Sequence, residues 1–226
     1  NNVSGALSLL KVMNDTNCDK LVFSSSASIF GNPISIPINE NHPKEPINAY
    51  GRSKLMIEQI LKDFNSAYGL KYISLRYFNA AGNDSDGELS EKHNPETHLL
   101  PLAMRAARGQ SKAFSIFGND YDTKDGTCIR DYVYVEDLAK IHLESLNLLF
   151  DDKFQSSEFN IGSGIGYSVK EVINEIENIV GKKVSVNYAN RRPGDPPVLI
   201  SDGQKLLKEL NSKMVFSNLK KIIETL

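Results

Sequence analysis

The chain has 226 residues, of which 40% are hydrophobic and 24% are charged, and its formal net charge is -2 at pH 7. This length supports one sizeable core, or one core with a small lobe, and the composition is that of an ordinary globular protein. The near-neutral charge and the lack of a Lys/Arg stripe argue against a nucleic-acid surface. No apolar run approaches the roughly 20 residues of a membrane-spanning helix. We therefore expect neither nucleic acid nor membrane as a partner.

Short apolar runs alternate with amphipathic helices, and this alternation is typical of βαβ units on a parallel sheet. In chain order, the sequence predicts a helix over 3–13, a strand over 20–26, a helix over 50–66, a strand over 72–78, a helix over 99–108, strands over 113–117 and 131–135, a helix over 137–149, a strand over 159–161, a helix over 169–180, a strand over 183–188 and two short final helices. The fold class is therefore α/β with a doubly wound parallel sheet. Loop-rich segments interleave with it and predict a second, smaller lobe.

The first residues indicate where in a domain the chain begins, and the cysteines indicate the compartment of the protein. The chain does not begin with Met, and its first predicted helix has no strand before it, so we expect it to begin partway through a domain. Only Cys18 and Cys128 are present, far apart in sequence, so we expect no disulfide framework. A reducing compartment, the cytoplasm, is the expected location.

Tyr50 and Lys54 lie four residues apart at the start of a predicted helix, so they share one helix face. A tyrosine phenol has an unperturbed pKa of about 10, which is too high for a general base at neutral pH. An ammonium group held close favours the phenolate and lowers that pKa. The pair alone also fits an exposed Tyr beside a solvated Lys, and both interpretations stay open at this point.

Three serines end the predicted strand over 20–26, at Ser24, Ser25 and Ser26. Ligands of open α/β sheets gather at the carboxyl ends of the strands, where a hydroxyl can hydrogen-bond a substrate hydroxyl and relay its proton. Serines at strand ends are also often satisfied by local backbone groups. A serine strand followed by Tyr-x-x-x-Lys on the next helix is a more demanding coincidence than either feature alone, and it favours a catalytic site.

Four segments resemble the extended short-chain dehydrogenase/reductase family. Residues 23–31 (FSSSASIFG) are similar to the family's serine strand, although Phe30 stands where Tyr is usual. Residues 50–54 (YGRSK) fit its catalytic helix, and residues 75–79 (LRYFN) fit its next strand. Residues 116–132 (IFGNDYDTKDGTCIRDY) look like the signature of the UDP-glucose 4-epimerase subgroup.

The resemblance implies a Rossmann-like sheet that lacks its first strands and a smaller α/β substrate-binding lobe. Residues 1–79 and 131–162 are expected to form the remainder of the NAD-binding domain, and residues 80–130 and 163–226 the nucleotide-sugar-binding lobe. The glycine-rich phosphate loop of such domains would precede the chain. The glycines near residue 162 are expected to form only a turn.

The implied activity is the reversible C4 epimerisation of UDP-galactose and UDP-glucose through a 4-keto intermediate, with hydride transfer to and from bound NAD. The resemblance assigns catalysis to Ser26, Tyr50 and Lys54. Tyr50 would take the proton of the C4 hydroxyl, Ser26 would relay it, and Lys54 would bind the nicotinamide ribose and lower the Tyr50 pKa. The implied cofactor contacts are Asn1, Ser26, Tyr50, Lys54 and Phe78.

Arg130 and Arg192 suit the pyrophosphate of a UDP-hexose, because a planar guanidinium group binds phosphate oxygens with two donors. The implied substrate contacts are Ser26, Tyr50, Asn79, His98, Leu99, Ser115, Ile116, Phe117, Arg130, Arg192, Asp195 and Leu199. No metal is expected, because neither His93 nor His98 has a carboxylate or Cys at ligand spacing. Relatives often dimerise through helices, and the helix over 50–66 could serve in a homodimer.

Three other functions are alternatives to the epimerisation of UDP-galactose and UDP-glucose. A dehydratase needs an Asp-Glu pair after the serine strand, and Ala27 and Ser28 stand there instead. A C4-epimerase that acts on UDP-N-acetylhexosamines stays open, because Leu199 is intermediate between the Tyr and the small residues that relatives carry at this gate. A catalytically inert dehydrogenase-fold protein, idle or truncated, is the third alternative. The intact Ser26, Tyr50 and Lys54 weigh against an idle site.

Overall fold

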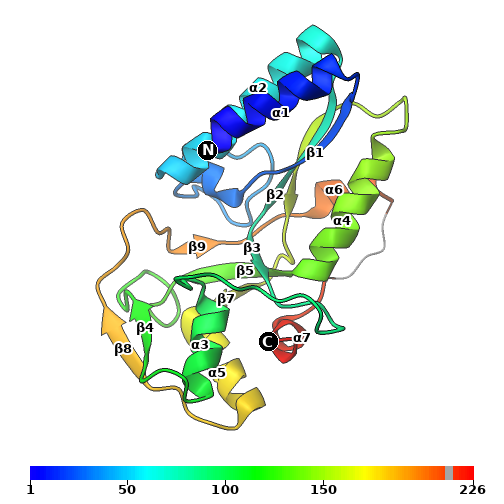
Figure 1. The fold of residues 1–226 in the computed structure, drawn as a ribbon. Helices are drawn as coiled ribbons and strands as arrows, with labels where there is room; N and C mark the ends of the chain where they lie inside the picture. The colour runs from blue at the N-terminus through cyan, green and yellow to red at the C-terminus, as the bar shows by residue number, and fades with distance from the viewer. Residues whose placement is uncertain (212–215) are drawn as a thin grey trace.

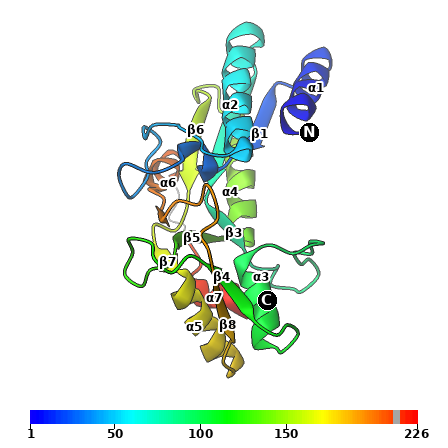
Figure 2. The same cartoon turned by 90° about the vertical axis from the view of Figure 1, so that its left-hand side faces the viewer.

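The computed structural model describes residues 1–211 and 216–226. They form two regions that lie end to end, as the views in Figures 1 and 2 show. Both regions combine helices and strands, so the expected α/β class is confirmed. Among the described residues, we find no helix with the length and apolar character that a bilayer crossing requires.

The first region is built on a parallel sheet of three strands. Strands β1 (Lys20–Ser24), β2 (Lys71–Tyr77) and β6 (Ser157–Ile161) lie in the order β1-β2-β6. Their register aligns Ser24 with Leu75 and Leu75 with Phe159. Because all three strands are parallel, their carboxyl ends share one edge, at which ligands of such sheets bind.

Helices cover both faces of this sheet (Figure 1). Helices α1 (Asn2–Asp15) and α2 (Ala49–Tyr68) share a buried cluster with Tyr72, whereas α4 (Val135–Leu148) shares another with Ile73. Consecutive strand residues point to opposite faces, so one strand serves both clusters. This two-sided cover is the doubly wound arrangement that the sequence predicts.

Strand β5 (Ile129–Tyr134) organises the middle of the molecule. It pairs in parallel with β3 (Asn79–Ala81) and β9 (Val198–Leu199), and antiparallel with β7 (Gly166–Ser168). Val133 of β5 belongs to the buried cluster of the first sheet, whereas Tyr132 and Tyr134 belong to that of the second region, so β5 joins the two cores.

The second region is a small α/β lobe. Strand β4 (Phe114–Phe117) pairs with β8 (Val186–Ala189), and helices α3 (Leu99–Ala107) and α5 (Val169–Val180) pack beside this pair. The side chains of α3, α5 and the short C-terminal helix share one buried cluster. The two short helices expected at the end are α6 (Gln204–Glu209) and α7 (Leu219–Glu224).

Most predicted elements are present, with ends shifted by a few residues. Helix α5 matches its predicted range, because Ser168 and Glu171 form a capping box at its start and Gly181 adopts a left-handed φ of 72° at its end. The strand predicted to reach Ser26 ends at Ser24, because the Ser26 side chain caps the 3-10 helix η1 (Ala27–Phe30). Strands β3, β7 and β9 were not predicted, since two or three residues carry no recognisable periodicity.

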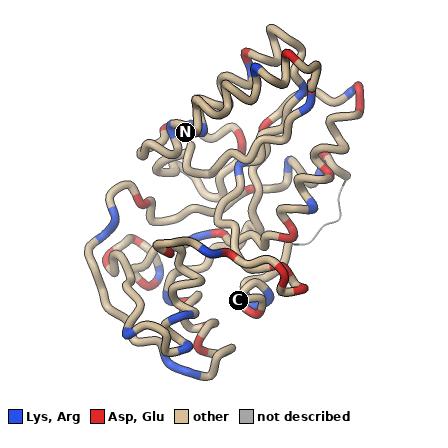
Figure 3. The backbone as a smooth tube through the Cα atoms, viewed as in Figure 1, with Lys and Arg blue, Asp and Glu red and all other residues tan. Residues whose placement is uncertain are grey.

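The division of the chain into two domains stays a prediction. The expected boundary at residue 131 falls inside β5, which pairs with β3, β7 and β9 instead of with the β1-β2-β6 sheet. Figure 3 shows Lys and Arg interspersed with Asp and Glu along both regions. No single-sign stripe runs over the described part of the chain, in agreement with the near-neutral composition.

Candidate active site

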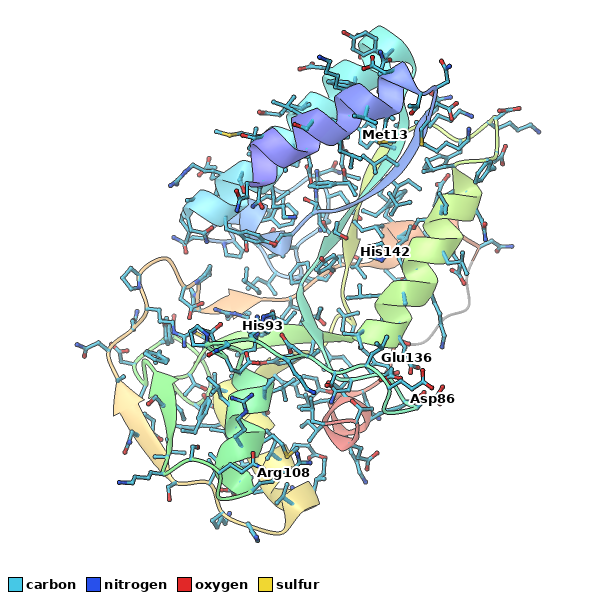
Figure 4. The ribbon with its side chains drawn as sticks, in the orientation of Figure 1. Met13, Asp86, His93, Arg108, Glu136 and His142 are labelled. Atoms are coloured by element: carbon cyan, nitrogen blue, oxygen red, sulfur yellow. The ribbon has the colours of Figure 1, made fainter. Side chains whose placement is uncertain are left out.

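The three serines at the end of β1 point into three different environments. The Ser24 hydroxyl lies 3.0 Å from Nε2 of His142, which projects from α4 toward the strands (Figure 4). The Ser25 hydroxyl donates a hydrogen bond to Glu58 at 2.6 Å. Ser26 accepts a hydrogen bond from the Ser28 amide at 3.2 Å and lines a small pocket of about 190 Å³. Ser26 is therefore the serine placed to meet a ligand.

The first turn of α2 brings Tyr50 to this serine. The Asn48 side chain caps the helix by accepting a hydrogen bond from the Gly51 amide at 2.8 Å. A Cβ on Gly51 would collide with the Ser28 carbonyl oxygen, so only glycine lets the helix approach the turn after β1 so closely. Tyr50 consequently lies near the Ser26 side chain, which acts to lower the pKa of its phenol.

Lys54 follows one turn later on the same face of α2. Its Nζ donates to the Ser24 carbonyl oxygen at 2.8 Å and lies 5.6 Å from the centroid of the Tyr50 ring. The structure thus brings Ser26, Tyr50 and Lys54 together at the carboxyl edge of β1. Tyr50 is 48% exposed, so a molecule at this edge can reach its hydroxyl.

The pKa of Tyr50 differs from the sequence expectation. Partial burial raises the pKa of Tyr50 above its usual value, and the hydrogen bond with Ser26 only partly opposes this effect. Burial also lowers the pKa of Lys54. The expected lowering of the Tyr50 pKa by Lys54 is therefore wrong for this arrangement, in which the ammonium is engaged with the Ser24 carbonyl.

A larger pocket of about 570 Å³ opens between β5, α3 and β4. It contains nine of the residues that the resemblance implies as substrate contacts: Asn79, His98, Leu99, Ser115, Ile116, Phe117, Arg130, Arg192 and Asp195. The smaller pocket shares Asn79, Arg130 and Asp195 with it and adds Ser26, Phe78 and Leu199. The two pockets join the nucleotide-binding candidates to the serine edge, which is the end of β1 with residues Ser24 to Ser26.

Two arginines are held differently in this pocket. Arg130 forms an ion pair with Asp195 and donates to the Pro196 carbonyl at 2.7 Å, so its guanidinium is fixed in place. The Arg192 guanidinium stacks over the Phe117 ring at 3.9 Å from the centroid. A diphosphate would meet one anchored and one stacked guanidinium, and Asp195 would share Arg130 with it.

The expectation that His93 and His98 lack a carboxylate partner is wrong. Glu91 Oε1 lies 2.9 Å from His93 Nε2 and 2.8 Å from His98 Nδ1, and Glu96 Oε1 lies 2.9 Å from the same His98 atom. His93 is visible in Figure 4 on the loop before α3. The ligating atoms of Glu91, His93 and His98 could hold a cation, but hydrogen bonds within the cluster explain its geometry equally well.

The turn after β6 is not a phosphate loop. The Asp131 carboxylate accepts hydrogen bonds from the Ser163 amide at 2.8 Å and from the Gly164 amide at 3.0 Å. These amides are the donors that a phosphate would need. The expectation of an ordinary turn at Gly162 is therefore confirmed.

The residues expected to contact NAD occupy the same edge of the first sheet. Phe78 is 9% exposed just after β2, and Asn1 precedes α1, whose Asn2 side chain donates to Ser53 at 2.9 Å. With one Lys54 donation directed to Ser24, its remaining N–H groups are available for ribose hydroxyls. The donor set thus fits a nicotinamide nucleotide.

Several pocket residues were missed by the sequence argument. They come from the loop before α3, the segment before β4, and strand β5 with the residue before it: Glu96, Thr97, Ser111, Cys128 and Tyr132. The length of the polar loop was the signal for the first two, since long loops in compact domains are often binding loops. Cys128 and Tyr132 lie inside the segment over 116–132 that carries the resemblance, and nothing in the local sequence singles out Ser111.

Comparisons with known proteins agree with this geometry. The family model described as NAD dependent epimerase/dehydratase family matches residues 1–162. The UDP-glucose 4-epimerase of Streptococcus mutans is 45% identical over 223 residues, which are 99% of this chain and 67% of that protein.

Two solved structures superpose closely on the chain. The UDP-glucose 4-epimerase from Brucella ovis in complex with NAD is 45% identical with a TM-score of 0.94, over 100% of this chain and 69% of that one. The enzyme from Bifidobacterium longum in complex with NAD+ and UDP is 38% identical with a TM-score of 0.93, over 100% of this chain and 67% of that one. The chain therefore belongs to the NAD dependent epimerase/dehydratase family.

Proposed function

We propose that the protein catalyses the reversible C4 epimerisation of UDP-galactose and UDP-glucose through a 4-keto intermediate, with NAD as its bound cofactor. The observation that carries the proposal is the meeting of Ser26, Tyr50 and Lys54 at one sheet edge, beside a pocket that holds Arg130 and Arg192. The similarity to UDP-glucose 4-epimerases over nearly the whole chain supports the same activity.

In this mechanism Tyr50 accepts the proton of the sugar C4 hydroxyl and returns it in the second half of the reaction. Ser26, which lies near the phenol and lines the small pocket, would bridge the sugar hydroxyl and Tyr50. Because burial raises the pKa of Tyr50 and the Lys54 ammonium is engaged with the Ser24 carbonyl, the phenolate needs positive charge beyond that of Lys54. NAD, when bound, supplies the hydride acceptor and donor for C4, and its oxidised nicotinamide carries a further positive charge.

The nucleotide half of the substrate is held apart from the reacting carbon. Arg130 and Arg192 would bind the diphosphate, and the apolar side chains of Leu99 and Phe117 would pack against the nucleoside. The smaller pocket at Ser26 would take the sugar. Binding energy concentrated on the UDP leaves the hexose free to turn its other face toward the hydride.

We also propose a cytoplasmic homodimer. Both cysteines of the described chain are free thiols, as expected in a reducing compartment. On α1 and α2, Leu9 is 52% exposed and Met56 is 50% exposed, so these helices offer an apolar surface to a second copy. Light scattering of the purified protein tests the dimer, and a monomer at micromolar concentration would contradict it.

The direct test is an assay of UDP-galactose conversion with the protein expressed from its complete coding sequence. Tyr50→Phe removes the proton acceptor, so we expect kcat to fall by about 10²- to 10⁴-fold. Tyr68→Phe is the matched control, because Tyr68 ends the same helix and is 61% exposed away from the site. A wild-type protein that does not interconvert the two UDP-hexoses would overturn the proposal.

A further inference from the structure

A fully buried ion pair lies directly beneath the serine edge. Arg76 on β2 donates from Nε to Glu58 Oε1 at 2.9 Å and from its terminal nitrogen to Glu58 Oε2 at 2.6 Å. The side chains are 1% and 2% exposed, respectively. Glu58 belongs to α2, so this two-pronged contact ties the helix to the sheet.

Ser25 extends the pair to the end of β1. Its hydroxyl donates to Glu58 Oε1 at 2.6 Å, and its amide donates to the Leu75 carbonyl at 2.9 Å. Ser25 is 0% exposed, so no ligand competes for its hydroxyl. Ser25, Glu58 and Arg76 therefore connect β1, α2 and β2 at one buried point.

The position of Glu58 on α2 links this point to the reacting groups. Lys54 lies four residues before Glu58 and Tyr50 lies eight before it, so all three share one helix face. Any rotation or sliding of α2 about Glu58 would move the Tyr50 hydroxyl relative to Ser26. The same motion would alter the 2.8 Å contact between Lys54 and the Ser24 carbonyl.

Stability alone does not account for such a pair. Replacement of a buried ion pair by apolar residues of similar size is often neutral or stabilising, because both charges must be desolvated. In addition, Nη1 of Arg76 is buried without a hydrogen-bond partner among the described residues. A role in positioning α2 against the sheet therefore explains the Glu58–Arg76 pair better than a role in stability.

We propose that Ser25, Glu58 and Arg76 are positioning residues that set the rotation and depth of α2 against the serine edge. They hold Tyr50 and Lys54 in register with Ser26 without touching the substrate. This inference rests on the proposed epimerase function for its kinetic consequence, but its geometric consequence can be measured separately.

The test uses two variants that leave no fully buried charge unpaired, since Glu158, 4.0 Å from Arg76, keeps its ion pair with Lys62. Ser25→Ala removes one link, and the double variant Glu58→Leu with Arg76→Met removes the pair while keeping the core filled. We expect kcat to fall by about tenfold or more in both, because small misplacements of reacting groups cost rate steeply. The KM for UDP-galactose should change less than twofold, since the UDP pocket lies on other elements, and the melting temperature should stay near that of the wild type.

Lys71→Met is the control, because Lys71 lies on the same strand as Arg76 but pairs with the exposed Asp152, so that the contacts of Ser25, Glu58 and Arg76 stay intact. Its kcat should equal the wild-type value. A double variant with wild-type kcat and KM would overturn the inference. If the double variant had a lower kcat, a higher KM and a lower melting temperature together, the pair would have a merely structural role, and the inference would be overturned as well.

A crystal structure of the double variant separates the two proposals. The inference expects the Lys54–Ser24 contact to open, whatever the wild-type protein catalyses. An unchanged contact overturns the positioning role. A displaced contact in a protein whose wild type lacks epimerase activity would support the inference and refute the proposed function.

Discussion

Substitution of Gly51 by alanine should distinguish a steric effect from helix propensity, because the two change the free energy of unfolding in opposite directions. Alanine in place of glycine inside a helix normally stabilises by up to about 1 kcal/mol. At this position, however, the new Cβ would collide with the Ser28 carbonyl oxygen, would lie 2.9 Å from the carbonyl carbon of Ser28 and 3.0 Å from Cβ of Pro46. Overpacking of this kind costs about 1–3 kcal/mol. We therefore expect a net loss of stability.

The magnitude follows from the balance of these two effects. A net loss of about 1–2 kcal/mol would lower the melting temperature by roughly 2–8 °C in a protein of this size. The displaced turn also carries Tyr50 away from Ser26, so kcat should fall by about tenfold or more. Scanning calorimetry and the UDP-galactose conversion assay measure the two effects.

Gly5→Ala in α1 is the matched control, because nothing lies within 4 Å of a Cβ there. Its melting temperature should stay equal or rise. If Gly51→Ala raised the melting temperature as Gly5→Ala does, the close approach of α2 to the turn after β1 would be refuted.

Three further predictions concern binding, pH and specificity. Arg192→Ala should raise the KM for UDP-hexoses by roughly 10- to 100-fold with little change in kcat, because a charged hydrogen-bond donor to the diphosphate is lost; Arg191→Ala, whose guanidinium pairs with Asp120 outside the pocket, should leave KM unchanged in the same steady-state assay. Burial raises the pKa of Tyr121 and of Tyr134 to about 12, so their contribution to the free energy of unfolding should be constant up to about pH 10 and be lost from there toward pH 12, where the unfolded tyrosines are already ionised. Urea unfolding at graded alkaline pH measures this fall, and a flat profile would contradict the burial of these phenols. Leu199→Tyr should abolish any activity on UDP-N-acetylglucosamine but retain activity on UDP-glucose, because Leu199 lines the small pocket with Ser26; equal losses on both sugars would exclude a gating role.

The proposed catalytic residues were accessible to sequence reasoning because their signal is local. The spacing of Tyr50 and Lys54 fixes their shared helix face, and the serine run marks a strand end. The direction of the Tyr50 pKa was not accessible, because burial decides it and burial depends on the packing of α2 against the turn after β1. The pocket residues came from the resemblance, since they lie on segments far apart in sequence.

Two clusters escaped the sequence argument for a common reason. Glu58 and Arg76 are charged residues that would normally be assigned to the surface, and only the packing of α2 against β2 buries them together. The contact of Glu91 with His98 depends on the closure of a polar loop, which has no periodic signal. Tertiary contacts between non-adjacent elements therefore set the limit of what the sequence predicts.

The most direct measurement of the central claim is the conversion of UDP-galactose that carries deuterium at C4, in ordinary water, by the wild type and by Tyr50→Phe. The account predicts that the UDP-glucose formed by the wild type retains the label at C4 and that Tyr50→Phe forms product at least about a hundredfold more slowly. Loss of the label to water, or an unchanged rate with Tyr50→Phe, would contradict a mechanism in which Tyr50 removes the hydroxyl proton while the C4 hydride leaves and returns.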